Sequence, residues 1–316
     1  MKVLITGATG LIGSHIIEDC IKSNISVNFL TTSRRKIIKS DMVNGYYWNP
    51  SKKVIDLDCF IDIDTIIALS GSSIFSLWTR KRKKEIISSR VLSLDFLKES
   101  IENNDIKISQ LISASGISLY PDSLKIKYDE NESTFDDSFL SNVIMKWETA
   151  ANSFSTIGVK VSIVRIGLVL SKKAGVLKQT IMPMKFGFGI IFGSGNQIQS
   201  WIHINDLSRI FLFIMQKKIE GNYNAVSNNN LTNLEFTRTI SSNYSRAIFN
   251  IKIPKIFFSL IFGEMHEILF KSHNISSRKI QNLGFRFKFE NFDYKLFLSL
   301  RIILLKATTI LSFDPE

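Results

Sequence analysis

Residues 1–14, MKVLITGATGLIGS, decide the fold of this chain. A short apolar run ends at Thr6, and Gly7, Gly10 and Gly13 follow before an amphipathic stretch. In such a turn the first glycine permits the sharp bend, the second lets backbone approach a pyrophosphate, and the third lets helix and strand pack closely. Free N–H groups at the helix N-terminus then attract phosphate. We predict a dinucleotide-binding strand–turn–helix; the alternative is a glycine-rich turn in an α/β fold without a ligand.

The end of the second strand, expected at residues 27–31, indicates which dinucleotide is bound. Proteins that prefer NAD usually carry an Asp or Glu there, but no acid occurs between residues 25 and 40. Hydroxyl groups and a guanidinium suit a 2′-phosphate, because Arg pairs bidentately with phosphate oxygens. The residues that offer them are Thr31, Thr32, Ser33 and Arg34. The sequence therefore favours NADP over NAD, the alternative being a solvated basic loop.

Composition restricts the class of protein. A chain of 316 residues is long enough for a doubly wound domain and a smaller second one. Its net charge of +12 includes a basic run at 80–84, which Thr79 can cap as the exposed start of a helix. We therefore expect no nucleic-acid partner. Two isolated cysteines and four scattered histidines predict neither a disulfide framework nor a metal site. The two cysteines fit a reducing compartment, and we expect a cytoplasmic location.

The two ends of the chain carry no sign of membrane insertion or targeting. The first strand begins almost at residue 1, so we expect no targeting peptide. The stretch 296–313 is apolar but is interrupted by Arg301 and Lys306. We expect a packed or peripheral helix there and no transmembrane span.

Apolar and amphipathic stretches alternate in the first half of the chain. Strands are expected at 64–69, 108–114 and 160–170, and helices at 82–103 and 139–156. This alternation predicts an α/β fold of the Rossmann type, a doubly wound parallel sheet with helices on both faces. Its ligands lie beyond the carboxyl ends of the strands. Residues expected at those ends include Leu69, Ser70, Gly71, Ser115 and Gly167.

The pattern changes after about residue 171, where a glycine-rich region and short mixed elements begin. We predict a smaller C-terminal α+β substrate lobe. The expected organisation is a Rossmann domain over 1–225 with substrate-side elements from about 171, a small domain over 250–300, and a tail over 301–316.

Several stretches together carry a family resemblance. They include TGATGLIG (6–13), SASGISLY (113–120), KWETAA (146–151) and FGFGIIFGSGNQIQSWIHINDL (186–207). The chain resembles extended and atypical short-chain dehydrogenases/reductases, and within them the NAD(P)-binding epimerase subfamily. The resemblance extends to about residue 300, and residues 254–297 resemble the small domain of unknown function that closes this subfamily.

The resemblance implies a set of cofactor contacts. They fall on Gly7, Thr9, Gly10, Leu11, Ile12, Gly13, Thr31, Thr32, Ser33, Arg34, Leu69, Ser70, Gly71, Glu85, Arg90 and Gly167. For Glu85 and Arg90 the alternative is an ion pair on a helix surface.

The catalytic pair of the superfamily is missing. Typical members use Tyr-x-x-x-Lys, in which the Lys lowers the Tyr pKa so that the phenol exchanges a proton at neutral pH. None of the seven tyrosines has a Lys four residues later. Alignment on the expected helix puts Val143 and Trp147 at the two positions, and a one-residue shift puts Asn142 and Lys146 there. Ordinary dehydrogenase or epimerase chemistry is therefore in doubt.

Three residues remain as catalytic candidates. Ser115 stands where the superfamily places its catalytic Ser, Tyr120 follows in the same loop, and Lys146 could approach the cofactor ribose. The alternatives are a loop tyrosine that packs on the substrate lobe and a lysine that lies along the helix surface. We interpret His203 as structural, bracing a turn in which Asp206 caps the next helix.

Two functions are compatible with these observations. One is an NADP-dependent oxidoreductase or nucleotide-sugar epimerase-like enzyme, acting on an unknown small molecule, with a homodimer possible by analogy with the superfamily. The other is a catalytically inactive, cofactor-binding regulator, since cyanobacterial and plastid relatives of this kind are associated with division control. Loss of the Tyr–Lys pair favours the regulator, whereas Ser115 and the glycine-rich loop favour the enzyme.

Overall fold

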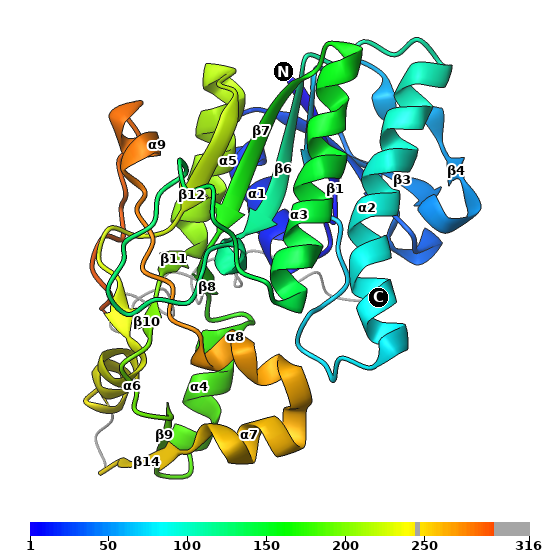
Figure 1. Ribbon diagram of the computed structural model, residues 1–316. Coiled ribbons are helices and arrows are strands. Elements are labelled where there is room, and N and C mark those ends of the chain that lie inside the picture. The colour runs from blue at the N-terminus through cyan, green and yellow to red at the C-terminus, as the bar shows by residue number, and fades with distance from the viewer. Residues whose placement is uncertain (244–246, 294–316) are drawn as a thin grey trace, which may run out of the picture.

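The computed structural model describes residues 1–243 and 247–293, and its centre is an eight-stranded sheet (Figure 1). The order of its strands is β12-β7-β6-β5-β1-β2-β3-β4. Their bounds are β1 (Lys2–Thr6), β2 (Ser26–Thr31), β3 (Val43–Asn49), β4 (Val54–Ile55), β5 (Thr65–Ala68), β6 (Gln110–Gly116), β7 (Lys160–Ile166) and β12 (Gly221–Ala225). All neighbours are parallel except β3 and β4. The predicted doubly wound fold is confirmed.

Helices cover both faces of the sheet. The helices α2 (Arg80–Asn103) and α3 (Phe139–Asn152) lie on one face, and α1 (Leu11–Lys22) and α5 (Ile204–Lys217) lie on the other (Figure 1). Successive strand residues point to opposite faces. Val3 and Ile5 thus belong to the apolar core under α1 and α5, whereas Leu4 belongs to the core under α2 and α3. This double burial explains why the first strand is a continuous apolar run.

Side chains cap the N-termini of two of these helices, α2 and α5. Thr79 caps α2 as predicted, because its hydroxyl accepts a hydrogen bond from the Arg82 N–H. The prediction that Asp206 caps the following helix is wrong. The cap is His203, whose Nδ1 accepts from the Asn205 N–H at 3.1 Å. Asp206 lies in the first turn and accepts instead from the backbone N–H groups of Lys288 and Phe289.

The predicted strand over 160–170 is divided at Gly167. A Cβ at this position would lie 2.5 Å from the Ser200 carbonyl oxygen, so the chain can make this close approach only with glycine. β7 stays in the main sheet, while β8 (Leu168–Leu170) leaves it and pairs with β11 (Trp201–His203). The substrate-side lobe begins at this break.

The lobe contains short helices and three two-stranded sheets, lying below the main sheet in Figure 1. Two of the sheets pair β10 with β13 and β9 with β14. The remaining bounds are α4 (Val176–Met184), β9 (Phe188–Phe192), β10 (Ile198–Gln199), β13 (Leu231–Thr232), α6 (Asn233–Ser241), β14 (Phe249–Ile253), α7 (Lys255–Phe262), α8 (Glu267–Phe270) and α9 (Arg278–Asn282).

The apolar stretch 296–313 lies outside the described residues, as does the predicted tail over 301–316. Across residues 1–243 and 247–293, no helix combines the length and the apolar character that crossing a bilayer requires.

Candidate functional site

The site lies where the strand order reverses. β1 pairs with β2 on one side and with β5 on the other, which opens a crevice beyond their carboxyl ends. A cavity of about 510 Å³ occupies this crevice. The predicted residues that line it are Gly7, Gly10, Leu11, Ile12, Gly13, Leu69, Gly71, Arg90, Ser115 and Gly167. Residues from β1 to β7 thus converge on one space.

The glycine turn has the geometry that a pyrophosphate needs. Gly7 has φ +67°, and a Cβ there would lie 2.6 Å from the Leu69 carbonyl oxygen. A Cβ at Gly13 would lie 2.5 Å from the Gly7 carbonyl oxygen, so that helix α1 packs directly on the turn. Gly10 is the N-cap of α1, and no side chain caps the helix. The first-turn N–H groups can therefore bind an anion.

The end of β2 lies beside the glycine turn but outside the cavity wall. Thr31 is buried, and its hydroxyl accepts a hydrogen bond from the Ser33 N–H at 3.2 Å. Arg34 is exposed, and its guanidinium lies 4.1 Å from the centre of the Tyr47 ring. Stacking on an aromatic ring orients a guanidinium without consuming its hydrogen-bond donors. Predicted residues that likewise lie outside the cavity wall are Thr9, Thr32 and Ser70.

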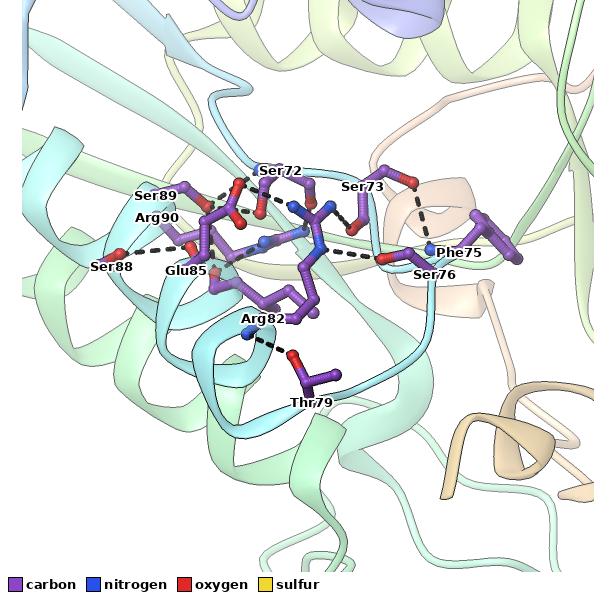
Figure 2. Close-up of polar contacts among 11 residues, drawn as sticks. Ser72, Ser73, Phe75, Ser76, Thr79, Arg82, Glu85, Ser88, Ser89 and Arg90 are labelled. Carbon is purple, nitrogen blue, oxygen red and sulfur yellow. Dashed lines mark hydrogen bonds and ion pairs between the residues drawn. The ribbon is translucent and has the colours of Figure 1, made fainter. Parts of the chain in front are cut away.

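A loop of residues 72–75 forms one wall of the cavity, and two arginines of α2 bind it and the adjacent Ser76 (Figure 2). Arg82 donates to the Ser73 carbonyl at 2.5 Å and to the Ser76 hydroxyl at 2.9 Å. Arg90 donates to the Ser72 carbonyl at 3.2 Å, and burial together with the charge of Arg82 lowers its pKa to about 10. Both guanidiniums therefore hold the wall in place.

Glu85 does not line the cavity, so the structure agrees with the alternative of a helix-surface ion pair and not with the expected cofactor contact. Its side chain is exposed on α2 and pairs with Arg82 at 2.7 Å (Figure 2). Glu85 lies five residues before Arg90, about 1.4 helical turns, so the two side chains leave the helix on different faces. Arg90 itself lines the cavity, with its guanidinium 5.0 Å from the centre of the Trp147 ring.

A buried polar network begins at Ser115, which lines the cavity. The Ser115 hydroxyl donates to Glu148 Oε1 at 2.6 Å. The two Glu148 oxygens accept from Nε and Nη2 of Arg165, at 2.9 and 2.8 Å. Burial alone would lower the Arg165 pKa, but the hydrogen bonds and charge of Glu148 raise it. The ion pair links α3 to β7 and fixes the orientation of the Ser115 hydroxyl.

Tyr120 completes this network away from the cavity. Its hydroxyl accepts from Arg165 Nη1 at 2.9 Å and donates to Asn224 Oδ1 at 2.8 Å. The side chain is fully buried, and burial raises its pKa against the opposing effect of Arg165. Tyr120 does not line the cavity, so the structure does not support its predicted role as a proton donor there.

Lys146 lies on a face of α3 that does not line the cavity. Val143 and Trp147, one turn apart, face the cavity, whereas Lys146 is exposed on another face of the helix. The alignment that puts Val143 and Trp147 at the Tyr and Lys positions therefore agrees with the structure. Apolar side chains occupy both positions. Of the two alternatives for Lys146, the structure agrees with a lysine on the helix surface and not with one that approaches a cofactor ribose in the cavity.

The opposite wall comes from β10, from α8 and from the segment that follows α8. It includes Gln199, Ile268, Lys271 and His273. Lys271 pairs with Asp136 at 2.6 Å and with Glu267 at 3.3 Å. Lys271 and His273 were not predicted, because no local motif marks them. The ion pair of Glu148 and Arg165 was not predicted either, although Glu148 occurs in a stretch that resembles the family.

His203 lies outside the cavity wall. Its ring stacks on Phe289 with 3.7 Å between centres, and burial lowers its pKa to about 4. A neutral, stacked imidazole that caps a helix has a structural role, as the sequence suggested. No group of three or more potential metal ligands occurs within the described parts of the chain.

The glycine turn, the uncapped helix and the cavity at the strand-order reversal define a dinucleotide-binding Rossmann protein of the short-chain dehydrogenase/reductase type. The chain belongs to the NAD dependent epimerase/dehydratase family, whose model matches residues 3–226. A second model, a domain of unknown function designated DUF1731, matches residues 253–294. The predicted family membership is confirmed.

Relatives in other organisms match almost the whole chain. An epimerase family protein of Staphylococcus aureus strain N315 is 31% identical over 300 residues, which cover 93% of this chain and 97% of the relative. One of Staphylococcus epidermidis is 32% identical over 295 residues, covering 92% and 96%.

Solved structures share the fold. Human epimerase family protein SDR39U1 (isoform 2), in a crystal structure with NADPH, superposes with a TM-score of 0.78 at 24% identity and covers 92% of this chain and 96% of that one. A nucleoside-diphosphate sugar epimerase from Corynebacterium glutamicum gives a TM-score of 0.72 at 25% identity, covering 92% and 56%.

Proposed function

We propose that this chain binds NADP(H) in the cavity and acts as an oxidoreductase or epimerase-like enzyme without the Tyr-x-x-x-Lys pair. The observation that carries the proposal is the uncapped N-terminus of α1, which opens with its glycine turn into a cavity of about 510 Å³. When bound, the cofactor would supply a hydride donor or acceptor at its nicotinamide. The protein would act in the cytoplasm on a small molecule, with no nucleic-acid partner and with homodimerisation possible.

Two observations favour NADP over NAD. No carboxylate occurs between residues 25 and 40, and Arg34 is exposed at the end of β2 with its guanidinium over Tyr47. The human relative has been crystallised with NADPH. In this proposal Thr31, Thr32, Ser33 and Arg34 hold the 2′-phosphate. The pyrophosphate and nicotinamide halves lie against Gly7, Thr9, Gly10, Leu11, Ile12, Gly13, Leu69, Ser70, Gly71, Arg90 and Gly167.

Ser115 is the residue that would orient the substrate. Its proton is engaged by Glu148, so its oxygen is available to accept a hydrogen bond from a substrate hydroxyl. Tyr120 and Lys146 are not part of this proposal, since neither lines the cavity.

A cofactor-binding regulator without catalysis, for example of cell or plastid division, is the second candidate. The observation that favours it is the apolar pair Val143 and Trp147, which occupies the positions of the proton-handling Tyr and Lys. An assay of NADPH oxidation with carbonyl compounds separates the two candidate functions. An enzyme would oxidise NADPH with one of them, whereas a regulator would bind NADPH and oxidise none.

Calorimetric titration with NADPH and NADH tests cofactor binding. We expect NADPH to bind more tightly, and Arg34→Ala to weaken NADPH about tenfold or more while leaving NADH unchanged. Arg35→Ala is the matched control, since it removes the same charge from the neighbouring exposed position. If neither NADPH nor NADH binds, the proposed function is excluded.

A further inference from the structure

Helix α7 is apolar except for Lys255 and Ser259, and none of its residues is buried. Its inner face packs on the lobe through Phe258, whose ring centre lies 5.1 Å from that of Phe192 and 5.7 Å from that of Phe270. A helix that is apolar nearly all round is normally buried on every side. In α7 the described part of the chain covers the inner face and leaves the outer face in solvent.

Four large side chains project from the outer face of α7. Ile256 and Leu260 lie one helical turn apart, as do Phe257 and Ile261, so the four form one continuous stripe, the α7 ridge. Their exposed fractions are 64%, 79%, 57% and 65% in that order. Scattered exposed apolar residues are normal, but a continuous stripe marks an interaction site. Side chains this exposed protrude from the surface, so they do not form a groove that would receive a peptide.

The strand before α7 adds to the apolar surface. β14 and β9 are parallel partners, and Phe249 lies opposite Phe188 across this pair. Both are exposed, as are Ile251, two residues along β14, and Phe186 in the turn before β9. In Figure 1, β9, β14 and α7 lie together at the end of the lobe farthest from the main sheet. Exposed apolar side chains therefore gather at one end of the molecule.

Basic residues surround this apolar end. The segments 176–192 and 247–262, which contain α4, β9, β14 and α7, include four lysines and no Asp or Glu. The basic run at 80–84 lies close to the other end of α7, because Lys83 pairs with Glu264, two residues after the helix. The exposed basic residues of these segments are Lys178, Lys185, Lys252, Lys255, Arg80, Lys81 and Lys84.

The charge of this surface distinguishes between possible partners. The neighbouring carboxylates of Glu264 and Glu85 are paired with Lys83 and Arg82, so the surface is positive. A second copy of this chain would bring the same lysines together in a two-fold contact, which is unfavourable. Residues 294–313 contain three basic residues and no acid, so they offer no opposite charge either. A bilayer with anionic lipids offers both negative headgroups and an apolar interior.

We propose that the α7 ridge, β14 and the turn before β9 form a peripheral membrane-binding surface for bilayers that contain anionic lipids. The ridge enters the boundary between headgroups and acyl chains, and the lysines and the basic run bind lipid phosphates. The protein thus lies on the bilayer without crossing it. None of the exposed apolar residues of this surface lines the cavity, so the inference does not depend on the cofactor.

Vesicle flotation of the full-length protein tests the proposal. Vesicles of equal parts phosphatidylglycerol and phosphatidylcholine are compared with vesicles of phosphatidylcholine alone. We expect wild type to float with the anionic vesicles and to bind the neutral ones at least about tenfold more weakly. We also expect high salt to weaken binding to the anionic vesicles, because salt screens exposed charges.

Two double variants change the two components of the surface separately. Ile256→Ser/Leu260→Ser removes apolar side chains from the ridge, and Lys252→Glu/Lys255→Glu reverses two charges beside it. We expect each to weaken binding to anionic vesicles about tenfold or more. All four residues are exposed, so the Tm of both variants should equal that of wild type.

Each double variant has a matched control. Leu57→Ser/Ile61→Ser also removes two exposed aliphatic residues four positions apart, in a stretch that carries aspartates and no lysine. Lys107→Glu/Lys160→Glu makes the same charge change near the amino ends of β6 and β7. Figure 1 shows these strand ends at the top of the molecule, away from α7. We expect both controls to float like wild type.

Several outcomes would overturn the membrane surface. They are wild type that does not float with anionic vesicles, equal binding to neutral vesicles, and controls that weaken binding as much as the surface variants. Binding that neither surface variant alters would assign it to another segment, such as 294–316. If light scattering shows a dimer that Ile256→Ser/Leu260→Ser dissociates while vesicle binding is unchanged, the ridge is a contact between copies. If one surface variant fails to fold, the other decides.

Discussion

Replacing Glu148 by Leu isolates the buried network beneath the cavity. The Glu148 and Arg165 side chains are 10% and 4% exposed, and three charge-assisted hydrogen bonds end on the carboxylate. Removing one partner of such a pair leaves an unpaired buried charge, which costs about 3–5 kcal/mol. We expect Glu148→Leu to lower the free energy of unfolding by that amount, and the double variant Glu148→Leu/Arg165→Met to lower it less, since no charge is left unpaired.

Urea unfolding, monitored by tryptophan fluorescence, measures the free energy of unfolding of both variants. An unchanged m-value shows that only the stability has changed. A surface pair, Lys53 and Glu99, serves as the control, because breaking an exposed pair costs at most about 1 kcal/mol. A loss below about 1 kcal/mol in Glu148→Leu, or a double variant less stable than the single one, would refute the reasoning.

Three further predictions concern the cofactor turn, acid stability and the exposed face of α3. Gly13→Ala places a Cβ 2.5 Å from a carbonyl oxygen, so we expect loss of NADPH binding and a destabilisation of about 1–3 kcal/mol; calorimetric binding equal to wild type would contradict this. Burial lowers the pKa of His203 and His273 to about 4, below the unfolded value near 6.5, so the unfolded state binds protons first on acidification. Their stabilisation is therefore complete above about pH 6.5 and declines towards pH 4, by roughly 2 kcal/mol for each ring between pH 7 and pH 5. His203→Asn keeps a side chain that can cap the helix, and we expect it to reduce the loss of stability between pH 7 and pH 5. The urea midpoint measured against pH tests this, and a profile equal to that of wild type would show that the buried His203 ring does not cause the loss. Lys146→Ala should leave NADPH affinity unchanged and stability within about 0.5 kcal/mol, and a tenfold loss of affinity would show that the lysine reaches the cofactor.

The sequence predicts the sheet well because its signals are local. The apolar run Val3–Ile5 and the glycines after it specify strand, turn and helix without help from the rest of the chain. β3 (Val43–Asn49) was not predicted, because its glycine and polar residues obscure the apolar pattern. Gly45 is required there by packing, since a Cβ would lie 2.6 Å from the Phe29 ring.

The site was only partly predictable, for a related reason. Ser115 could be placed because the carboxyl ends of parallel strands meet at one edge. The pairing of Glu148 with Arg165 joins residues from different elements and leaves no spacing to detect. The choice between Lys146 and Trp147 depended on one residue of helical register, which the sequence left open.

The two sides of the cavity are encoded in separate parts of the gene. The glycine turn lies within the first 14 residues, whereas Lys271 and His273 come from the C-terminal segment. Under the proposed function, substitutions in that short segment would change the wall that a substrate meets and would leave the glycine turn intact. Grafting residues 268–273 between relatives would then be a compact way to exchange substrate specificity.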